Sequence, residues 1–168
     1  MAKCRGCGKK GFFLRIQDGL CENCYRAQDH ARIVQEMNSL ERTYKQKLDR
    51  HFVLSQKMQK AYRAAKRDST PMDKVIAICE EDIALAEGLY KYWTRHRQLG
   101  IQAGYWTAQT NKGIPQYPSF TYLAAIYEDT KNYDKALDIC KRAISIGFTG
   151  DHVFNNIHDR IERIETSR

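Results

Sequence analysis

The sequence predicts a mainly all-α protein with a small non-helical module at its N-terminus. Two CxxC pairs lie close together before residue 26, and no proline or glycine occurs between Tyr25 and Asp68. Two similar helical segments then begin at Asp73 and Asp134. A chain of 168 residues can hold one ordinary core and a small satellite module. We therefore expect three parts, which are residues 1–26, 27–69 and 70–168.

The N-terminal module is defined by two cysteine pairs, Cys4 with Cys7 and Cys21 with Cys24. Zinc binds four thiolates tetrahedrally, and the tight turn of a CxxC pair directs two sulfurs to one ion. Disulfides or a redox CxxC are the alternatives, but a redox motif needs a surrounding α/β domain that this segment lacks. Four cysteine ligands leave no position for water, so the sequence predicts a structural Zn²⁺ ion.

The segment between the two pairs, FFLRIQDGL, is expected to form a short β-hairpin. Asp18-Gly19 is typical of the tight turn in such a hairpin. Phe12 and Phe13 are expected to close the small core of the module itself, and stacking of either ring on a nucleic-acid base is the alternative. Together, the CxxC turn, the hairpin and a second pair at a helix start resemble a treble-clef or zinc-ribbon-like finger over residues 3–27.

Residues 25–68 are expected to form one long helix, because good helix formers dominate this stretch. Steps of four and three residues select a largely apolar seam: Ile33, Met37, Leu40, Tyr44, Lys47, His51, Leu54, Met58, Ala61 and Ala65. Such a seam is typical of a coiled coil or of a helix packed along another. Lys47 and His51 interrupt it. A homodimer through the long helix and an intramolecular hairpin both remain open.

The back half contains a repeated segment, DKVIAICEEDIA and later DKALDICKRAIS. Such self-similarity is typical of stacked repeats. Cys79 and Cys140 share one position of the two copies and are expected to be small core residues. The residues of the second copy and of the segment before it fall where a tetratricopeptide repeat places its packing residues: Phe120, Leu123, Ala124, Tyr127, Ala136 and Ala143.

Residues 117–150 therefore resemble one tetratricopeptide repeat, which implies antiparallel helix pairs. A plain helical hairpin bundle is the alternative. In the tail, apolar residues recur as in a capping helix: Val153, Phe154, Ile157, Ile161 and Ile164.

Aromatic residues surround a glycine- and proline-containing connection over residues 100–119. Connections of this length are uncommon in compact domains and are often functional. Trp93, Tyr105, Trp106 and Tyr117 are expected either to line a concave face where aromatics anchor a peptide, or to fill the gap between repeats. Both interpretations stay open.

The positive charge is concentrated in the front of the chain. Residues 1–26 carry six lysines or arginines and two acidic residues, and residues 27–68 carry ten and five. One interpretation is a solvated, lysine-rich surface. The other is a grip on nucleic-acid phosphates by the basic face of the long helix and by the basic residues of the finger: Lys3, Arg5, Lys9, Lys10 and Arg15.

These patterns favour a non-enzymatic function. The sequence contains no glycine-rich phosphate loop and no HExxH motif, and no stretch approaches the roughly 18 apolar residues of a membrane span. We expect a cytoplasmic, zinc-containing adaptor or scaffold that binds a protein or peptide, not a membrane, through its helical domain. Such layouts resemble small bacterial or phage accessory proteins. A nucleic-acid-binding or regulatory protein is the alternative.

Overall fold

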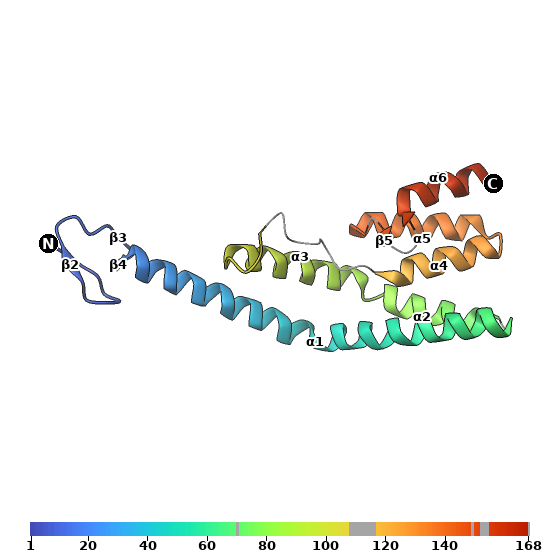
Figure 1. Cartoon of the computed structure of the whole chain (residues 1–168), viewed down its shortest axis with the longest axis horizontal. Coiled ribbons are helices and arrows are strands. Elements are labelled where there is room, and N and C mark those ends of the chain that lie inside the picture. Colours follow the sequence, from blue (N-terminus) through green and yellow to red (C-terminus); the bar gives the residue numbers. More distant parts are fainter. Residues whose placement is uncertain (70, 108–116, 149, 152–154, 168) are drawn as a thin grey trace. The chain divides into compact units, whose positions relative to one another are not determined.

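A computed structural model describes residues 1–69, 71–107, 117–148, 150–151 and 155–167. The predicted mainly all-α fold class is confirmed (Figure 1). The helices are α1 Glu22–Asp68, α2 Asp73–Ile83, α3 Ala86–Gln102, α4 Pro118–Asp129, α5 Tyr133–Ile146 and α6 Ile157–Ser167. Short antiparallel strand pairs join β1 Ala2–Lys3 with β2 Lys10–Gly11, β3 Ile16–Gln17 with β4 Leu20–Cys21, and β5 Gly150–Asp151 with β6 Asn155–Asn156.

The chain divides into two compact units. The first comprises Met1–Thr43 and Arg95–Asn111, and the second comprises Tyr44–Thr94 and Lys112–Arg168. Helices α1 and α3 are each divided between the two units, with one segment in the first unit and one in the second.

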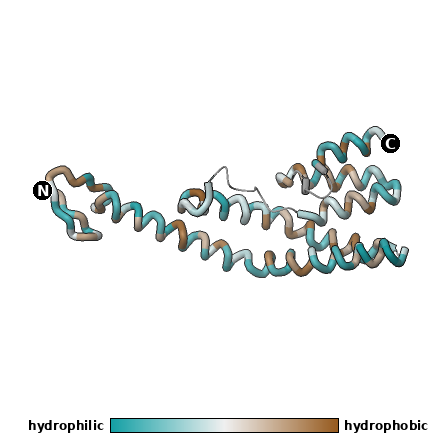
Figure 2. Tube along the Cα trace, viewed as in Figure 1, coloured by the Kyte–Doolittle hydropathy of each residue, from teal (hydrophilic) through white to brown (hydrophobic). Residues whose placement is uncertain are grey.

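The long helix α1 confirms the expected rod, and its apolar seam is largely buried. Figure 2 shows hydrophobic positions along α1 separated by longer hydrophilic stretches. In the first unit, Ile33 and Met37 pack with Leu99 of α3, and in the second unit Met58 and Ala65 join a core with α2. The seam is therefore covered within the chain, as in the hairpin arrangement, whereas a homodimer through α1 stays a prediction. Lys47 is exposed, but His51 is buried.

In the second unit, α4 packs antiparallel against α5, while α2 packs on α4 and α6 packs on α5. Five of the six positions that resemble a tetratricopeptide repeat are buried, and Tyr127 is half-buried. The helix pair that this pattern implies is present, whereas its membership of that repeat family stays a prediction. Helices α1 to α6 all contribute apolar side chains to the core of this unit. Its fully buried members include Met58, Ile83, Leu89, Phe120, Leu123, Ile126 and Ile164.

Local signals set the ends of α5. The Asn132 side chain accepts a hydrogen bond from the Lys135 N–H, as expected of an N-cap residue. Gly147 ends the helix at φ 108°, a left-handed conformation that favours glycine, and its N–H bonds to the carbonyls of Ala143 and Ile144.

The expected capping helix is α6, which an ion pair ties to α4. The buried Arg160 donates from Nη1 to Oε1 of Glu128 at 2.5 Å, and Arg163 donates to Oε2 at 2.9 Å. Ile157 and Ile164 are buried, whereas Val153 and Phe154 lie outside the described residues.

Cys79 and Cys140 are buried, as expected of small core residues. Burial raises the pKa of the Cys79 thiol to about 12 and that of the Cys140 thiol to about 11. Both thiols are therefore protonated and unreactive at neutral pH.

Within the described part of the chain, no helix has the length and apolar character needed to cross a bilayer.

Candidate metal centre and exposed surfaces

The four cysteines of the two CxxC pairs converge on one point of the N-terminal finger, which we define as residues 1–26. The Sγ atoms of Cys4, Cys7, Cys21 and Cys24 all lie within 4.8 Å of one another, and none is in a disulfide. The Sγ atoms of Cys7 and Cys21 are 3.7 Å apart. Four thiolates placed tetrahedrally at about 2.3 Å from a zinc ion lie roughly 3.8 Å apart, so the sulfur set fits a closed tetrahedral site.

Backbone hydrogen bonds place these sulfurs. The Cys4 N–H donates to the Lys9 carbonyl at 2.8 Å, and the Gly8 N–H donates to the Cys4 carbonyl at 2.9 Å, which closes the first CxxC turn. The Cys21 N–H points at the Sγ of Cys4 at 3.2 Å and so joins the two pairs. Hydrogen bonds of this kind orient metal-binding thiolates and stabilise their charge.

The sulfur cluster packs tightly against Gly6. A Cβ atom there would lie 3.0 Å from both Cβ and Sγ of Cys24 and 3.1 Å from a methyl group of Leu20. The interior of the finger therefore consists of the sulfurs and the adjoining aliphatic side chains.

The predicted turn at Asp18-Gly19 is confirmed. The two residues join β3 to β4 with φ values of 50° and 79°, and a type I′ turn requires positive φ at both positions. A Cβ atom at Gly19 would overlap the Arg5 guanidinium, which donates to the Asp18 carbonyl at 2.6 Å. The Arg5 hydrogen bond thus connects the turn to the segment of the first CxxC pair.

Neighbouring groups shift the pKa values of two of the four thiols, those of Cys4 and Cys24. Backbone N–H groups of Cys21 and Cys7 stabilise the Cys4 thiolate and lower its pKa to about 6. Hydrogen bonds with the sulfurs of Cys21, Cys7 and Cys4 raise the pKa of Cys24 to about 12, because a further negative charge beside them is unfavourable. A divalent cation among the four sulfurs removes this repulsion, so the cluster is suited to a metal ion.

The expectation that Phe12 and Phe13 close the core of the finger is wrong. Their side chains are 79% and 100% exposed, respectively. Leu14 and Leu20 are half-buried instead, and Leu20 lies with Cys24 against Gly6. A metal cluster needs little apolar cover, so the two rings are left on the outside.

The five basic residues proposed for phosphate contacts are all exposed: Lys3, Arg5, Lys9, Lys10 and Arg15. Arg5 is engaged with the Asp18 carbonyl. Lys3 lies directly opposite Lys10 in the β1–β2 register, which places two like charges on the same face of the hairpin.

The four aromatic residues proposed for partner binding separate into two pairs. Tyr117 is buried in the second unit, where Trp93 packs edge-on against it with ring centroids 6.1 Å apart. Tyr105 and Trp106 belong to the first unit and are 53% and 38% exposed. Tyr117 is therefore a core residue, in line with the gap-filling interpretation. The side chains of Tyr105 and Trp106 are partly exposed and accessible to a partner.

A turn at the end of α3 brings Tyr105 and Trp106 back toward Gly100 of the same helix. Gly104 has φ 77°, and the N–H groups of Tyr105 and Trp106 both donate to the Gly100 carbonyl. The Tyr105 ring meets His30 of α1 edge-on, with centroids 5.7 Å apart. Beside this contact lies an open groove of about 540 Å³, lined by His30, Ala31, Val34, Gln35, Asn38, Arg42 and Tyr105.

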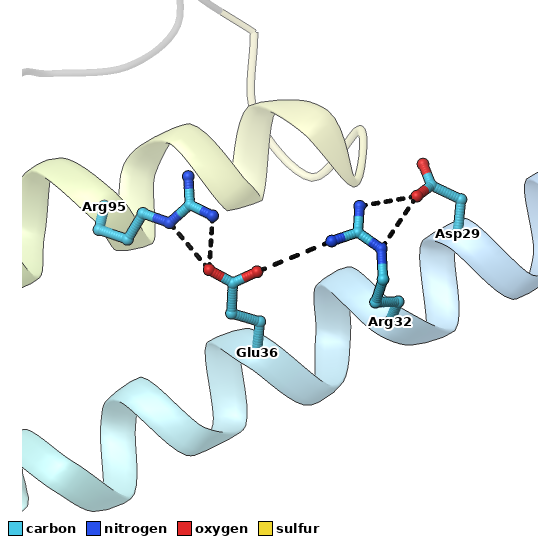
Figure 3. A network of polar contacts seen from close by, with 4 residues as sticks. All are labelled: Asp29, Arg32, Glu36 and Arg95. Atoms are coloured by element: carbon cyan, nitrogen blue, oxygen red, sulfur yellow. Dashed lines mark hydrogen bonds and ion pairs between the residues drawn. The ribbon is translucent and has the colours of Figure 1, made fainter.

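A polar network holds α3 against α1 in the first unit (Figure 3). Arg95 of α3 donates from Nε and Nη2 to Oε1 of Glu36, at 2.9 and 2.5 Å. The other Glu36 oxygen lies 4.0 Å from Arg32, which in turn donates to Asp29. These side chains are at least one-third exposed, so each pair contributes at most about 1 kcal/mol.

Sequence reasoning missed a buried polar network in the second unit. Asp82 is fully buried; its Oδ1 lies 2.8 Å from Nδ1 of His51, and its Oδ2 accepts from the Ser119 hydroxyl at 2.5 Å. Tyr117 donates to the Asp82 carbonyl, and its ring stacks on the His51 ring at 4.5 Å. Burial, together with the Asp82 charge, raises the pKa of Tyr117. One feature of the sequence could have revealed this network, namely a polar residue on an apolar helix face. Asp82 follows the buried Val75 and Cys79 at helical spacing.

Two helical glycines should respond oppositely to alanine. Alanine normally stabilises a helix interior by about 1 kcal/mol relative to glycine. At Gly100, however, a Cβ atom would overlap the Trp106 ring, so Gly100→Ala should lower the melting temperature and expose Trp106 to iodide quenching. At Gly88 the nearest atom is the flexible end of Lys47, 3.3 Å away, so Gly88→Ala should preserve or raise the melting temperature. Equal responses would show that the ring does not rest on Gly100.

No family model matches the chain, and searches of curated proteins and of solved structures find no match.

Proposed function

We propose that the protein is a non-enzymatic adaptor: a zinc-held finger joined to a helical body that binds a protein partner. Cys4, Cys7, Cys21 and Cys24 would hold the ion, and with all four positions taken by thiolates it would have a structural role. A bound Zn²⁺ supplies the charge that keeps all four sulfurs ionised together. The chain then uses the folded finger and its helices for binding.

The observation that carries the adaptor proposal is the half-exposed Tyr105 at the edge of the groove beside α1. Aromatic anchors beside a groove dominate the energy of many protein interfaces. The groove also offers the cationic Arg42 and the amides of Gln35 and Asn38, which suit an acidic or amide-rich peptide segment. Tyr105 and Trp106 are thus the proposed partner-binding residues, and Trp93 and Tyr117 support the core.

Photo-crosslinking tests this proposal directly. A p-benzoylphenylalanine placed at Tyr105 in the full chain should give a discrete protein adduct in the cells of origin. The same probe at Phe52, which is 58% exposed but lies in the second unit, is the matched control. With the captured partner purified, Tyr105→Ala should weaken binding about 30-fold, as expected for a hot-spot aromatic. Adducts identical at both positions, or unchanged affinity of Tyr105→Ala, would contradict the groove as the partner site.

A further inference from the structure

The β2–β3 loop, residues 12–15, presents two aromatic rings beside several basic side chains. Phe13 is fully exposed and Phe12 is 79% exposed, which is unusual for adjacent large apolar residues. Lys9 and Lys10 precede the rings and Arg15 follows them, and all three are exposed. No acidic residue occurs before Asp18, so every charged residue in the sequence on either side of the rings up to that position is cationic.

A second observation points to an anionic ligand at the same place. Lys3 and Lys10 are directly paired across β1 and β2, so their ammonium groups share one face of the hairpin. Like charges opposite each other destabilise a strand pair, and an anion between them relieves the repulsion. Among the described residues, no ion pair engages Lys3, Lys9, Lys10 or Arg15, so their charges remain available.

We propose that the finger binds single-stranded nucleic acid, with Phe12 and Phe13 stacking on unpaired bases and Lys3, Lys9, Lys10 and Arg15 contacting phosphates. Aromatic platforms beside a cationic surface are the physical requirements for holding a single strand. A duplex keeps its bases stacked on one another, so it cannot use the two rings. This inference goes beyond the proposed adaptor role and concerns a different surface from the groove at Tyr105.

The chemistry of the loop also sets the expected specificity. Residues 9–15 read KKGFFLR and contain no amide, hydroxyl or carboxylate side chain. Apart from its lysines and arginine, the loop has no side chain that can read a base edge by hydrogen bonds, and stacking tolerates every base. Binding should therefore vary little with base sequence.

An anionic membrane surface is the competing ligand, because basic and aromatic residues also bind lipid headgroups. Two phenylalanine rings provide a small apolar area, and stable membrane anchoring usually requires a longer apolar segment or a second signal. Base stacking requires only one exposed ring face for each base, which is what the loop offers.

Fluorescence anisotropy with the full-length, zinc-loaded protein tests the proposal. The probes are labelled 20-nucleotide oligothymidine, 20-nucleotide oligouridine and a 20-base-pair DNA duplex, at two salt concentrations. Both single strands should bind more tightly than the duplex, and a difference between them would report a contact to the 2′-hydroxyl or to the thymine methyl group. Each of Phe12→Ala and Phe13→Ala should weaken binding by about 5- to 150-fold. Phe52→Ala, which removes an exposed ring elsewhere, should leave it unchanged.

The lysines are tested by the salt dependence. Lys3→Ala with Lys10→Ala should reduce the slope of log affinity against log salt by about 1.4, which corresponds to two lost phosphate contacts on a single strand. Lys74→Ala with Lys141→Ala removes the same charge from exposed positions of α2 and α5 and should leave the slope unchanged.

Three results would overturn the proposal: duplex binding as tight as single-strand binding, full affinity in the double alanine variant of Phe12 and Phe13, or binding only to phosphatidylserine vesicles. Zinc content and circular dichroism of each variant establish that the finger is folded. The crosslinking experiment at Tyr105 is independent, so either proposal can fail while the other stands.

Discussion

Chelation of the proposed Zn²⁺ ion should unfold the finger and leave the helical body intact. Its two hairpins pair only two residues per strand, and its interior is mainly the sulfur cluster. A module of this size cannot bury enough apolar surface to fold alone, so metal binding supplies its folding free energy, about 10–16 kcal/mol for structural zinc in finger peptides. Helical circular dichroism should remain nearly constant, because most helical residues lie outside the finger.

Thiol titration makes this expectation quantitative. With metal bound, the native protein should show no reactive thiol. After chelation four thiols should react, while Cys79 and Cys140 stay protected by burial and by their raised pKa values. Denaturation should release all six. Cys7→Ser should lose the metal, whereas Cys140→Ser, a matched control in α5, should bind one equivalent. Four reactive thiols in freshly purified native protein, with no metal by mass spectrometry, would contradict the zinc assignment.

Removal of the Asp82 carboxylate should strongly destabilise the second unit. Asp82→Ala would leave the buried Nδ1 of His51 and the buried Ser119 hydroxyl without the carboxylate, whereas Tyr117 would keep the backbone carbonyl of residue 82 as its acceptor. Breaking a buried pair from one side typically costs about 3–5 kcal/mol, because the remaining polar groups stay desolvated. Urea unfolding, followed by Trp93 fluorescence in a Trp106→Phe background, would measure this loss, since Trp93 lies 5.7 Å from the His51 ring.

The neighbouring ion pair offers a matched control. Arg50 and Glu81 precede His51 and Asp82 on the same two helices and pair with each other, but both side chains are about half exposed. Glu81→Ala should therefore cost at most about 1 kcal/mol. A similar loss for Glu81→Ala and Asp82→Ala would show that the buried network does not stabilise the unit.

Features set by local chemistry could be predicted from the sequence. The clustering of the four cysteines follows from the CxxC spacing, the Asp18-Gly19 turn from its need for positive φ, and α1 from the absence of helix breakers. The burial of Cys140 follows from its place on the apolar face of α5.

Features set by tertiary packing could not be predicted. Whether Phe12 lies inside or outside depends on the space left by the sulfurs, and the pairing of His51 with Asp82 joins residues that are 31 positions apart. Tyr105 and Tyr117 look alike in sequence, yet the chain places them in different units. The predicted boundaries at residues 26 and 69 stay predictions.

The residues that determine the fold of the finger are different from the aromatic residues that it exposes, and this separation has an evolutionary consequence. The four sulfurs, Gly6 and the Asp18-Gly19 turn fix the fold, whereas the exposed rings of Phe12 and Phe13 contribute nothing to its interior. Substitutions in the β2–β3 loop should therefore accumulate without loss of metal or fold. A lineage that carries this finger could change what the loop recognises by a few codon changes while inheriting the same scaffold.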